Sequence, residues 1–211
     1  MGWFDLVQGF KSVVRTFHEI RNYKEVFKFL IAYLIYNDGI ETVILMASIF
    51  GVKELGFSQA DMIKCFLMIQ AVAFFGALLF GGLADKASHK RSISLTLWIY
   101  IGVCLWAVFM KTRVEFWILG AVVGMILGGS QAASRSFLVL IVPPGKNTEF
   151  FGFFALTGKL STVFGPFLFA TLAQLYSLRV AVGSLTVFFA LGLGILYFVR
   201  EPSRSTAELL S

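Results

Sequence analysis

Six long apolar segments constrain this chain more than any other feature of its sequence. The chain has 211 residues, of which 58% are hydrophobic and only 14% charged, and its mean hydropathy is +0.82. Soluble domains carry about 25% charged residues. The apolar residues fall in blocks of roughly 20, the length that crosses the hydrocarbon core of a bilayer. We therefore predict an all-α membrane protein whose six transmembrane helices lie near residues 27–50, 62–84, 92–110, 115–134, 150–175 and 180–199.

The segments outside these spans divide the chain into three predicted regions. Residues 1–25 form an amphipathic interfacial helix, because their apolar residues recur at helical spacing with Lys11 and Arg15 between them. The same helix could instead pack on the loops of its own protein. Residues 26–200 form the six-helix transmembrane domain, and residues 201–211 form a cytoplasmic tail.

The basic residues predict the orientation in the membrane. The formal net charge of +6 indicates orientation rather than nucleic-acid binding, because loop Lys and Arg collect on the cytoplasmic side. With the N-terminus inside, twelve bases lie inside and four outside. We therefore expect a multi-pass protein of the inner (plasma) membrane with both termini cytoplasmic, whose self-association is parallel. The inner bases are Lys11, Arg15, Arg21, Lys24, Lys28, Lys86, Lys90, Arg91, Arg135, Lys146, Arg200 and Arg204, and the outer ones are Lys53, Lys111, Arg113 and Arg179.

Polar residues are distributed unevenly among the six spans. The third and sixth spans contain no ionisable residue, whereas the first and fifth hold Asp38, Glu41 and Lys159, and the second and fourth hold Gln70, Gln131 and Arg135. Polar groups at membrane depth avoid lipid because facing it is costly. We expect the third and sixth spans to face lipid, and the other four to face inward or a partner. This period of three helices is typical of two three-helix inverted repeats.

The first span contains the most unusual residues, the cluster Asn37, Asp38 and Glu41. Asp38 lies about 11 residues into its helix and so roughly 16 Å deep, near the bilayer midplane. Spacings of three and four place all three side chains on one face. Two close carboxylates repel each other when both are charged, so one would be poised to take a proton. We expect a proton, cation or amine site in a watery crevice; the alternatives are a structural ion pair or an N-cap at a helix break near Gly39.

Further side chains complete the predicted substrate or proton-coupling site. Lys159 lies deep in the fifth span, where it either pairs with the acids or binds the opposite end of a zwitterion. Gln70 adds a polar group in the second span. Gln131 and Arg135 lie toward the inner end of the fourth, where Arg135 either binds an anionic group or is a positive charge at the membrane edge.

Two more motifs have plain structural explanations beside functional ones. Gly120, Gly124 and Gly128 are four apart and predict close helix packing. The loop GGLADKASHKR joins the second and third spans and is either a gating loop or an ordinary positive-inside loop. Its charged residues are Asp85, Lys86, Lys90 and Arg91.

Catalytic and metal chemistry lack the residues they need. His18 and His89 both lie outside the apolar segments, and Cys65 and Cys104 are too few for a zinc site or a disulfide framework. We predict no enzyme activity, no metal and no cofactor.

Four motifs together resemble the carboxyl-terminal half of the autophagy-related vacuole-effluxer family of the major facilitator superfamily. They are AYLIYNDGIETVI, QAVAFFGALLFGGLADK, GGSQAASRS, and EFFGFFALTGK followed by Gly165–Pro166. The resemblance implies that the first and fourth spans line a cavity, the second and fifth meet another half, and the third and sixth face lipid. It also implies that Asp85 helps to latch one conformation, although Ser88 stands where a glycine is usual.

Superfamily members normally have twelve spanning helices in two six-helix halves. The resemblance of this chain covers only the carboxyl-terminal half. The resemblance therefore implies a partner, which is a parallel homodimer or a complementary six-helix half. We expect a half-size secondary transporter of a small polar, amino-acid-like solute that works by alternating access and is coupled to protons. The alternatives are a non-transporting scaffold or regulatory module and one half of a split transporter.

Overall fold

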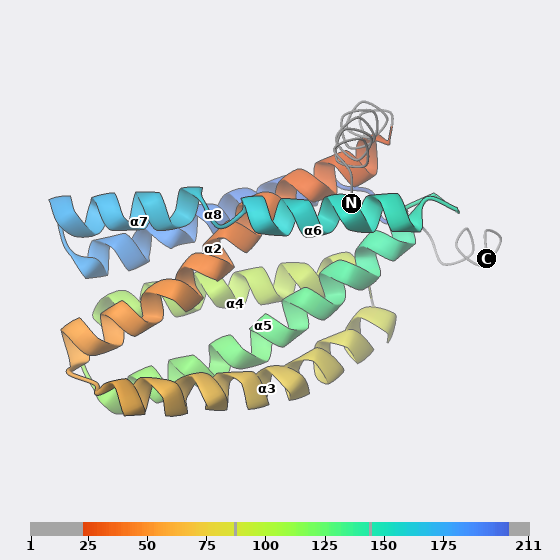
Figure 1. Cartoon of the computed structure of the whole chain (residues 1–211). Coiled ribbons are helices and arrows are strands. Elements are labelled where there is room, and N and C mark those ends of the chain that lie inside the picture. Colours follow the sequence, from red (N-terminus) through yellow and green to blue (C-terminus); the bar gives the residue numbers. More distant parts are fainter. Residues whose placement is uncertain (1–22, 87, 144, 203–211) are drawn as a thin grey trace, which may run out of the picture.

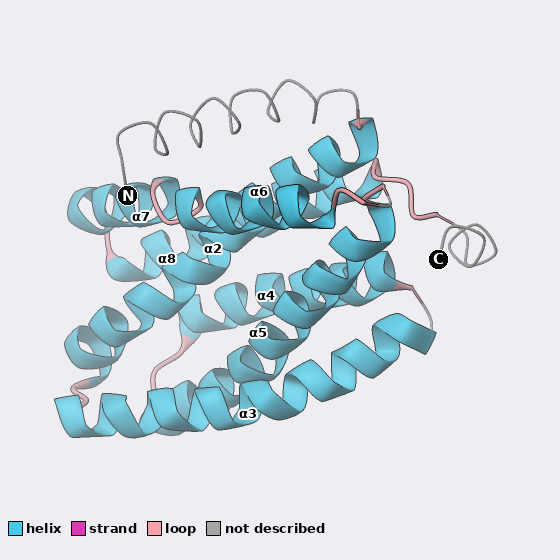
Figure 2. Cartoon of the chain, turned by 45° about the vertical axis from the view of Figure 1, so that its right-hand side comes forward, coloured by secondary structure: helices cyan, strands magenta, loops and turns pink. Residues whose placement is uncertain are grey.

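The structure is a computed structural model that describes residues 23–86, 88–143 and 145–202. The helix predicted at residues 3–20 lies outside these residues, as does nearly all of the predicted tail at 201–211. The described residues form helices and no strand (Figures 1 and 2). The helices are α2 (Lys24–Leu55), α3 (Gln59–Lys86), α4 (His89–Phe109), α5 (Arg113–Ile141), α6 (Asn147–Leu160), α7 (Phe164–Leu175) and α8 (Leu178–Tyr197).

Six helical segments are long and apolar enough to cross a membrane, which confirms the predicted number of spans. The fifth consists of two helices, α6 and α7, with a turn at residues 161–163. The fourth is longer than predicted and continues to Ile141. Beyond Ser134 the buried residues Phe137 and Leu138 alternate with the exposed Arg135 and Val139 at helical spacing, so the helix still has one face to bury.

The spans form two layers. Figure 1 shows α4 and α8 behind a front layer that consists of α2, α3, α5 and α6–α7. The contacts between helices have a two-fold pseudosymmetry that relates α2 to α5, α3 to α6–α7, and α4 to α8. The contact of α3 with α5 is therefore equivalent to that of α6–α7 with α2, and the contact of α2 with α8 is equivalent to that of α5 with α4. The contact of α4 with α8 lies on the symmetry axis and is its own equivalent. Equivalent helices are three positions apart in the order of the spans, and because this number is odd they cross the membrane in opposite directions, so the two repeats are inverted, as predicted.

The same symmetry extends to the caps of α4 and α8. Ser88 and Ser177 are their N-caps, and each hydroxyl accepts the backbone N–H three residues further on. Two residues after each cap is a base, Lys90 or Arg179, that donates to carbonyls at the C-terminus of the other helix. Cations there neutralise the negative end of the helix dipole. The acceptors are the carbonyl oxygens of Tyr197 and Val199 for Lys90, at 2.7 Å each, and of Val108 and Met110 for Arg179, at 2.8 and 2.7 Å.

The glycine stripe of α5 lies directly against α3. A Cβ on Gly128 would be 1.8 Å from the carbonyl oxygen of Ala73, and one on Gly124 would be 2.7 Å from that of Ile69. Gly120 leaves more room, since its Cβ would lie 3.3 Å from the sulfur of Cys65. The two backbones therefore touch along this stripe, which holds α3 at the edge of the front layer.

Candidate functional site

The break between α6 and α7 lies halfway along the fifth span. Helix α6 ends at Leu160, α7 begins at Phe164, and Pro166 in its first turn has no backbone N–H. A new helix start leaves unpaired N–H groups that carry partial positive charge. Inside a membrane such groups need a protein partner, because the hydrocarbon core offers none.

Side chains in the middle of α2 supply these partners. The amide Nδ2 of Asn37 donates to the Ser161 hydroxyl at 2.6 Å, and the backbone N–H of Gly165 donates to Asp38 Oδ2 at 2.8 Å. The Thr42 hydroxyl donates to the backbone carbonyl of Asp38 at 2.6 Å. Asp38 is thus a cap supplied to α7 by another helix.

This junction is closely packed. A Cβ on Gly165 would lie 2.0 Å from the Thr42 hydroxyl oxygen and 3.0 Å from Asp38 Oδ1, so only glycine fits. Asp38 is 2% exposed, and its Oδ1 has no hydrogen-bond partner among the described residues. The structure therefore holds a buried carboxylate with one satisfied and one unsatisfied oxygen.

The expectation that Asp38 faces a watery crevice is wrong for this structure. The N-terminus of α7 offers it an N–H and a positive dipole, which reduces the cost of burying the carboxylate inside the chain's own bundle. A break near Gly39 is also not found, because α2 is continuous there. Gly39 packs against Phe188 and Phe189 instead. The helix break belongs to the fifth span.

The other predicted site residues remain accessible. Glu41 and Gln131 are half-buried, and Gln70, Arg135 and Lys159 are exposed. They lie on α2, α5, α3 and α6, the helices of the front layer (Figure 1). None of these five side chains makes a hydrogen bond or ion pair within residues 23–86, 88–143 and 145–202, so the structure does not pair Lys159 with either acid. Their roles in binding or coupling remain predictions.

The site also includes two tyrosines, Tyr33 and Tyr36, that the sequence analysis did not identify. The Tyr36 hydroxyl and the Ser134 hydroxyl of α5 are 2.7 Å apart, and the ring of Tyr33 stacks on Phe154 of α6 with centroids 4.0 Å apart. Tyr33 lies four residues before Asn37 and three before Tyr36, so it lies one turn of α2 before both. This spacing was the available signal, but it is equally typical of ordinary core aromatics.

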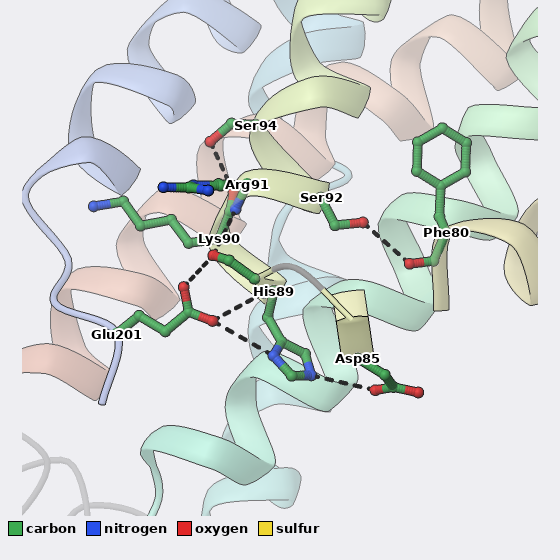
Figure 3. Close-up of polar contacts among 9 residues, drawn as sticks. Phe80, Asp85, His89, Lys90, Arg91, Ser92, Ser94 and Glu201 are labelled. Carbon is green, nitrogen blue, oxygen red and sulfur yellow. Dashed lines mark hydrogen bonds and ion pairs between the residues drawn. The ribbon is translucent and has the colours of Figure 1, made fainter. Parts of the chain in front are cut away.

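The predicted gating loop lies at the end of the bundle where α3 ends and α4 begins, which we call the basic end. Its strongest contacts involve Glu201, which sequence reasoning also missed (Figure 3). Glu201 accepts the Ser88 hydroxyl and, at 2.9 Å, the backbone N–H of His89. Asp85 is mostly exposed, and one of its oxygens lies 3.7 Å from His89 Nε2.

Glu201 belongs to a strap, residues 198–201, that follows α8 and crosses to two helix starts. Glu201 contacts the start of α4, as described above. At the start of α2, the backbone N–H of Arg200 donates to Glu25 at 2.5 Å, and the Lys28 amine donates to the Phe198 carbonyl at 3.3 Å. Lys90 holds the same segment, whereas Lys86 and Arg91 are exposed. The strap thus ties α2, α4 and α8 together at the basic end.

Replacing Glu201 with glutamine should loosen the strap. The substitution removes a charge from the N-terminus of α4, which costs about 1 kcal/mol. Hydrogen exchange of the His89 amide should then be about fivefold faster. Glu149→Gln, at an exposed acid in the first turn of α6, should leave it unchanged. Equal protection of His89 in the wild type and Glu201→Gln would show that the contact contributes no stability.

The fold and the junction of Asp38 with the N-terminus of α7 together define the class of membrane protein to which this chain belongs. Six apolar spans in two inverted three-helix repeats, with the fifth span broken near its middle, form one six-helix half of a major-facilitator fold.

The family described as "Vacuole effluxer Atg22 like" matches residues 4–208, so the chain belongs to this family. The chain is 38% identical over 199 residues to an uncharacterized MFS-type transporter, YxiO, from Bacillus subtilis, covering 94% of this chain and 46% of that protein. It is 29% identical to autophagy-related protein 22 of Yarrowia lipolytica over 99% of this chain and 37% of that protein. For the Saccharomyces cerevisiae protein of that name, the identity is 33% over 80% of this chain and 34% of that protein. The chain spans less than half the length of these relatives.

Proposed function

We propose that the chain is one half of a secondary transporter for a small polar, amino-acid-like solute, working by alternating access and coupled to protons. The observation that carries the proposal is the Asp38 carboxylate, buried at mid-span and holding the N-terminus of α7. Transporters use broken helices at this depth for substrate and ion sites. The names of the relatives describe transporters or vacuole effluxers rather than enzymes.

Protonation of Asp38 is the coupling step in this proposal. A neutral carboxyl group attracts the positive end of α7 less than a carboxylate does. Its unpaired Oδ1 is the oxygen available to the proton. Once Asp38 is neutral, α7 is freer to tilt about the turn at residues 161–163, so proton binding and movement of the fifth span are linked.

The solute class follows from the accessible charges of the front layer. Glu41 offers an anion to an ammonium group, whereas Lys159 and Arg135 offer cations to a carboxylate. A zwitterion satisfies both, and the half-buried Gln131 adds a neutral donor and acceptor.

The membrane location that we propose stays the one predicted from the basic residues, an inner (plasma) membrane with cytoplasmic termini.

A second six-helix half is part of the proposal. Gln70 and Lys159 are exposed near the middle of their spans, and a lysine that faces lipid at this depth is unfavourable by about 2.5–3.5 kcal/mol or more. We propose that a second copy of this chain, oriented in parallel, covers them. A complementary half from another polypeptide is the competing arrangement.

The test combines subunit counting with uptake. The chain is expressed alone, its copies per native nanodisc are counted, and uptake of labelled amino acids into proteoliposomes is measured, with a sugar as the control solute. The proposal predicts two copies and amino-acid uptake that a proton gradient accelerates. A monodisperse monomer would contradict the homodimer. A dimer that neither transports these solutes nor is stabilised by them would instead support a non-transporting scaffold.

A further inference from the structure

A groove on the outside of the bundle lies next to the strap, between α4 and the end of α8. It has a volume of about 840 Å³ and contains both charged and apolar side chains. The charged ones are at the basic end, at the start of α4 and on the strap. The apolar part is lined by Leu95, Trp98 and Leu140.

The bases in this groove differ in what they do for the fold. Lys90 is engaged with the Tyr197 and Val199 carbonyls. Arg91 lines the groove and is exposed, and its guanidinium makes no hydrogen bond or ion pair within the part of the chain that the structure describes. The inverted repeat places Val180 at the equivalent position of α8, three residues after the cap Ser177. Capping of the two helices therefore explains Lys90 but not Arg91.

The one acidic side chain that lines the groove, Glu201, already has hydrogen-bond donors. The oxygens of Glu201 accept the Ser88 hydroxyl and the His89 backbone N–H, and His89 Nδ1 lies 3.5 Å from one of them (Figure 3). With His89 neutral, Lys90, Arg91 and Glu201 leave the groove with one net positive charge. An anion at Arg91 would therefore meet a favourable field.

The apolar side chains continue from Arg91 along the same face of α4. Leu95 and Trp98 follow it by four and seven residues, so the three lie in one line. Both are exposed, at 45% and 60%. A cation at the start of the span, followed by an apolar wall that runs along the span into the membrane, matches the shape of an anionic phospholipid.

We propose that this groove binds an anionic phospholipid, with the lipid phosphate on the Arg91 guanidinium and an acyl chain along Leu95 and Trp98. Arginine suits the phosphate because its planar fork donates two parallel hydrogen bonds. The bound lipid would lie beside the strap and the start of α4. This site is independent of the transport site in the front layer.

The test uses the detergent-purified chain and its melting temperature with added lipid. Phosphatidylglycerol should raise the melting temperature by about 5 °C more than phosphatidylcholine does. Arg91→Gln should lose most of this difference and bind the lipid about tenfold more weakly. The matched control is Arg200→Gln, at an exposed arginine of the same end that does not line the groove, and it should keep the full shift.

Three outcomes would overturn the proposal. Phosphatidylglycerol and phosphatidylcholine could stabilise the chain equally, or Arg91→Gln and Arg200→Gln could lose the same amount. Inorganic phosphate at the same concentration could reproduce the shift, which would assign the site to a free anion. The lipid-free melting temperature of Arg91→Gln should equal that of the wild type, because the guanidinium holds nothing in the described structure.

Discussion

Replacing Gly128 with alanine should destabilise the chain by about 3 kcal/mol or more. The new methyl group would lie 1.8 Å from the Ala73 carbonyl oxygen and 2.9 Å from the Ala77 nitrogen. Both are backbone atoms of α3, so no side chain can move aside and the two helices must separate. Thermal unfolding followed by tryptophan fluorescence should show a melting temperature lower by about 6–12 °C.

Gly102→Ala is the matched control. Gly102 lies inside α4, and nothing is within 4 Å of the position that its Cβ would take. Alanine is the better helix former there by roughly 1 kcal/mol, so this variant should melt at the wild-type temperature or slightly above it. Equal melting temperatures for Gly128→Ala and Gly102→Ala would contradict the backbone contact between α3 and α5.

Gly165→Ala should be comparably damaging, at the junction of α2 and α7. Its methyl group would meet the Thr42 hydroxyl at 2.0 Å and the Asp38 carbonyl at 2.9 Å. To make room, α7 must move away from α2, which lengthens the hydrogen bond from the Gly165 N–H to Asp38. A buried carboxylate would then lose its donor, which costs about 1–3 kcal/mol in addition to the overpacking.

The control for this variant is Gly152→Ala. Gly152 lies in α6 and has open space around its Cβ position, so the substitution should be tolerated. Melting temperature and monodispersity after solubilisation report both variants. If Gly165→Ala folds as stably as Gly152→Ala, the close approach of α7 to α2 does not exist in the membrane.

The sequence predicted the six spans because length and hydropathy alone decide whether a helix can cross a bilayer. It predicted the inverted repeats from polarity, since the third and sixth spans lack ionisable groups. The break in the fifth span was not predicted, although Gly165 and Pro166 mark it in the sequence. Proline in the first turn of a helix and proline within a kinked one leave the same local pattern.

The candidate site was predicted by its unusual residues and not by its contacts. Asn37 and Asp38 stand out because polar groups are costly inside an apolar span. Their partners Ser161 and Gly165 lie more than 120 residues away, a separation that no local spacing encodes. The sequence offered Lys159 as the partner of Asp38, but in the structure a backbone N–H donates to Asp38 Oδ2 instead.

The repeat at residue level was equally hidden in the sequence. Ser88 with Lys90 and Ser177 with Arg179 share only a serine and a base two residues later, a pattern too short to recognise. The equivalence of the two pairs is recognised only in the structure, where each base donates to carbonyls at the end of the other helix. Glu201 was missed for a similar reason, because an acid just beyond the last span resembles any solvated charge.

The role of Asp38 in proton coupling is tested most directly by proton-driven solute uptake of Asp38→Asn in proteoliposomes. Asparagine keeps the size of the side chain and an oxygen for the Gly165 N–H, but it cannot exchange a proton. Asp61→Asn is the matched control, since Asp61 also accepts at the start of a helix, from Ser58, but lies at the surface. We expect Asp38→Asn to lower gradient-driven uptake by about tenfold or more and to abolish its pH dependence, while Asp61→Asn transports like the wild type. Unchanged uptake with unchanged pH dependence in Asp38→Asn would exclude Asp38 as the coupling residue.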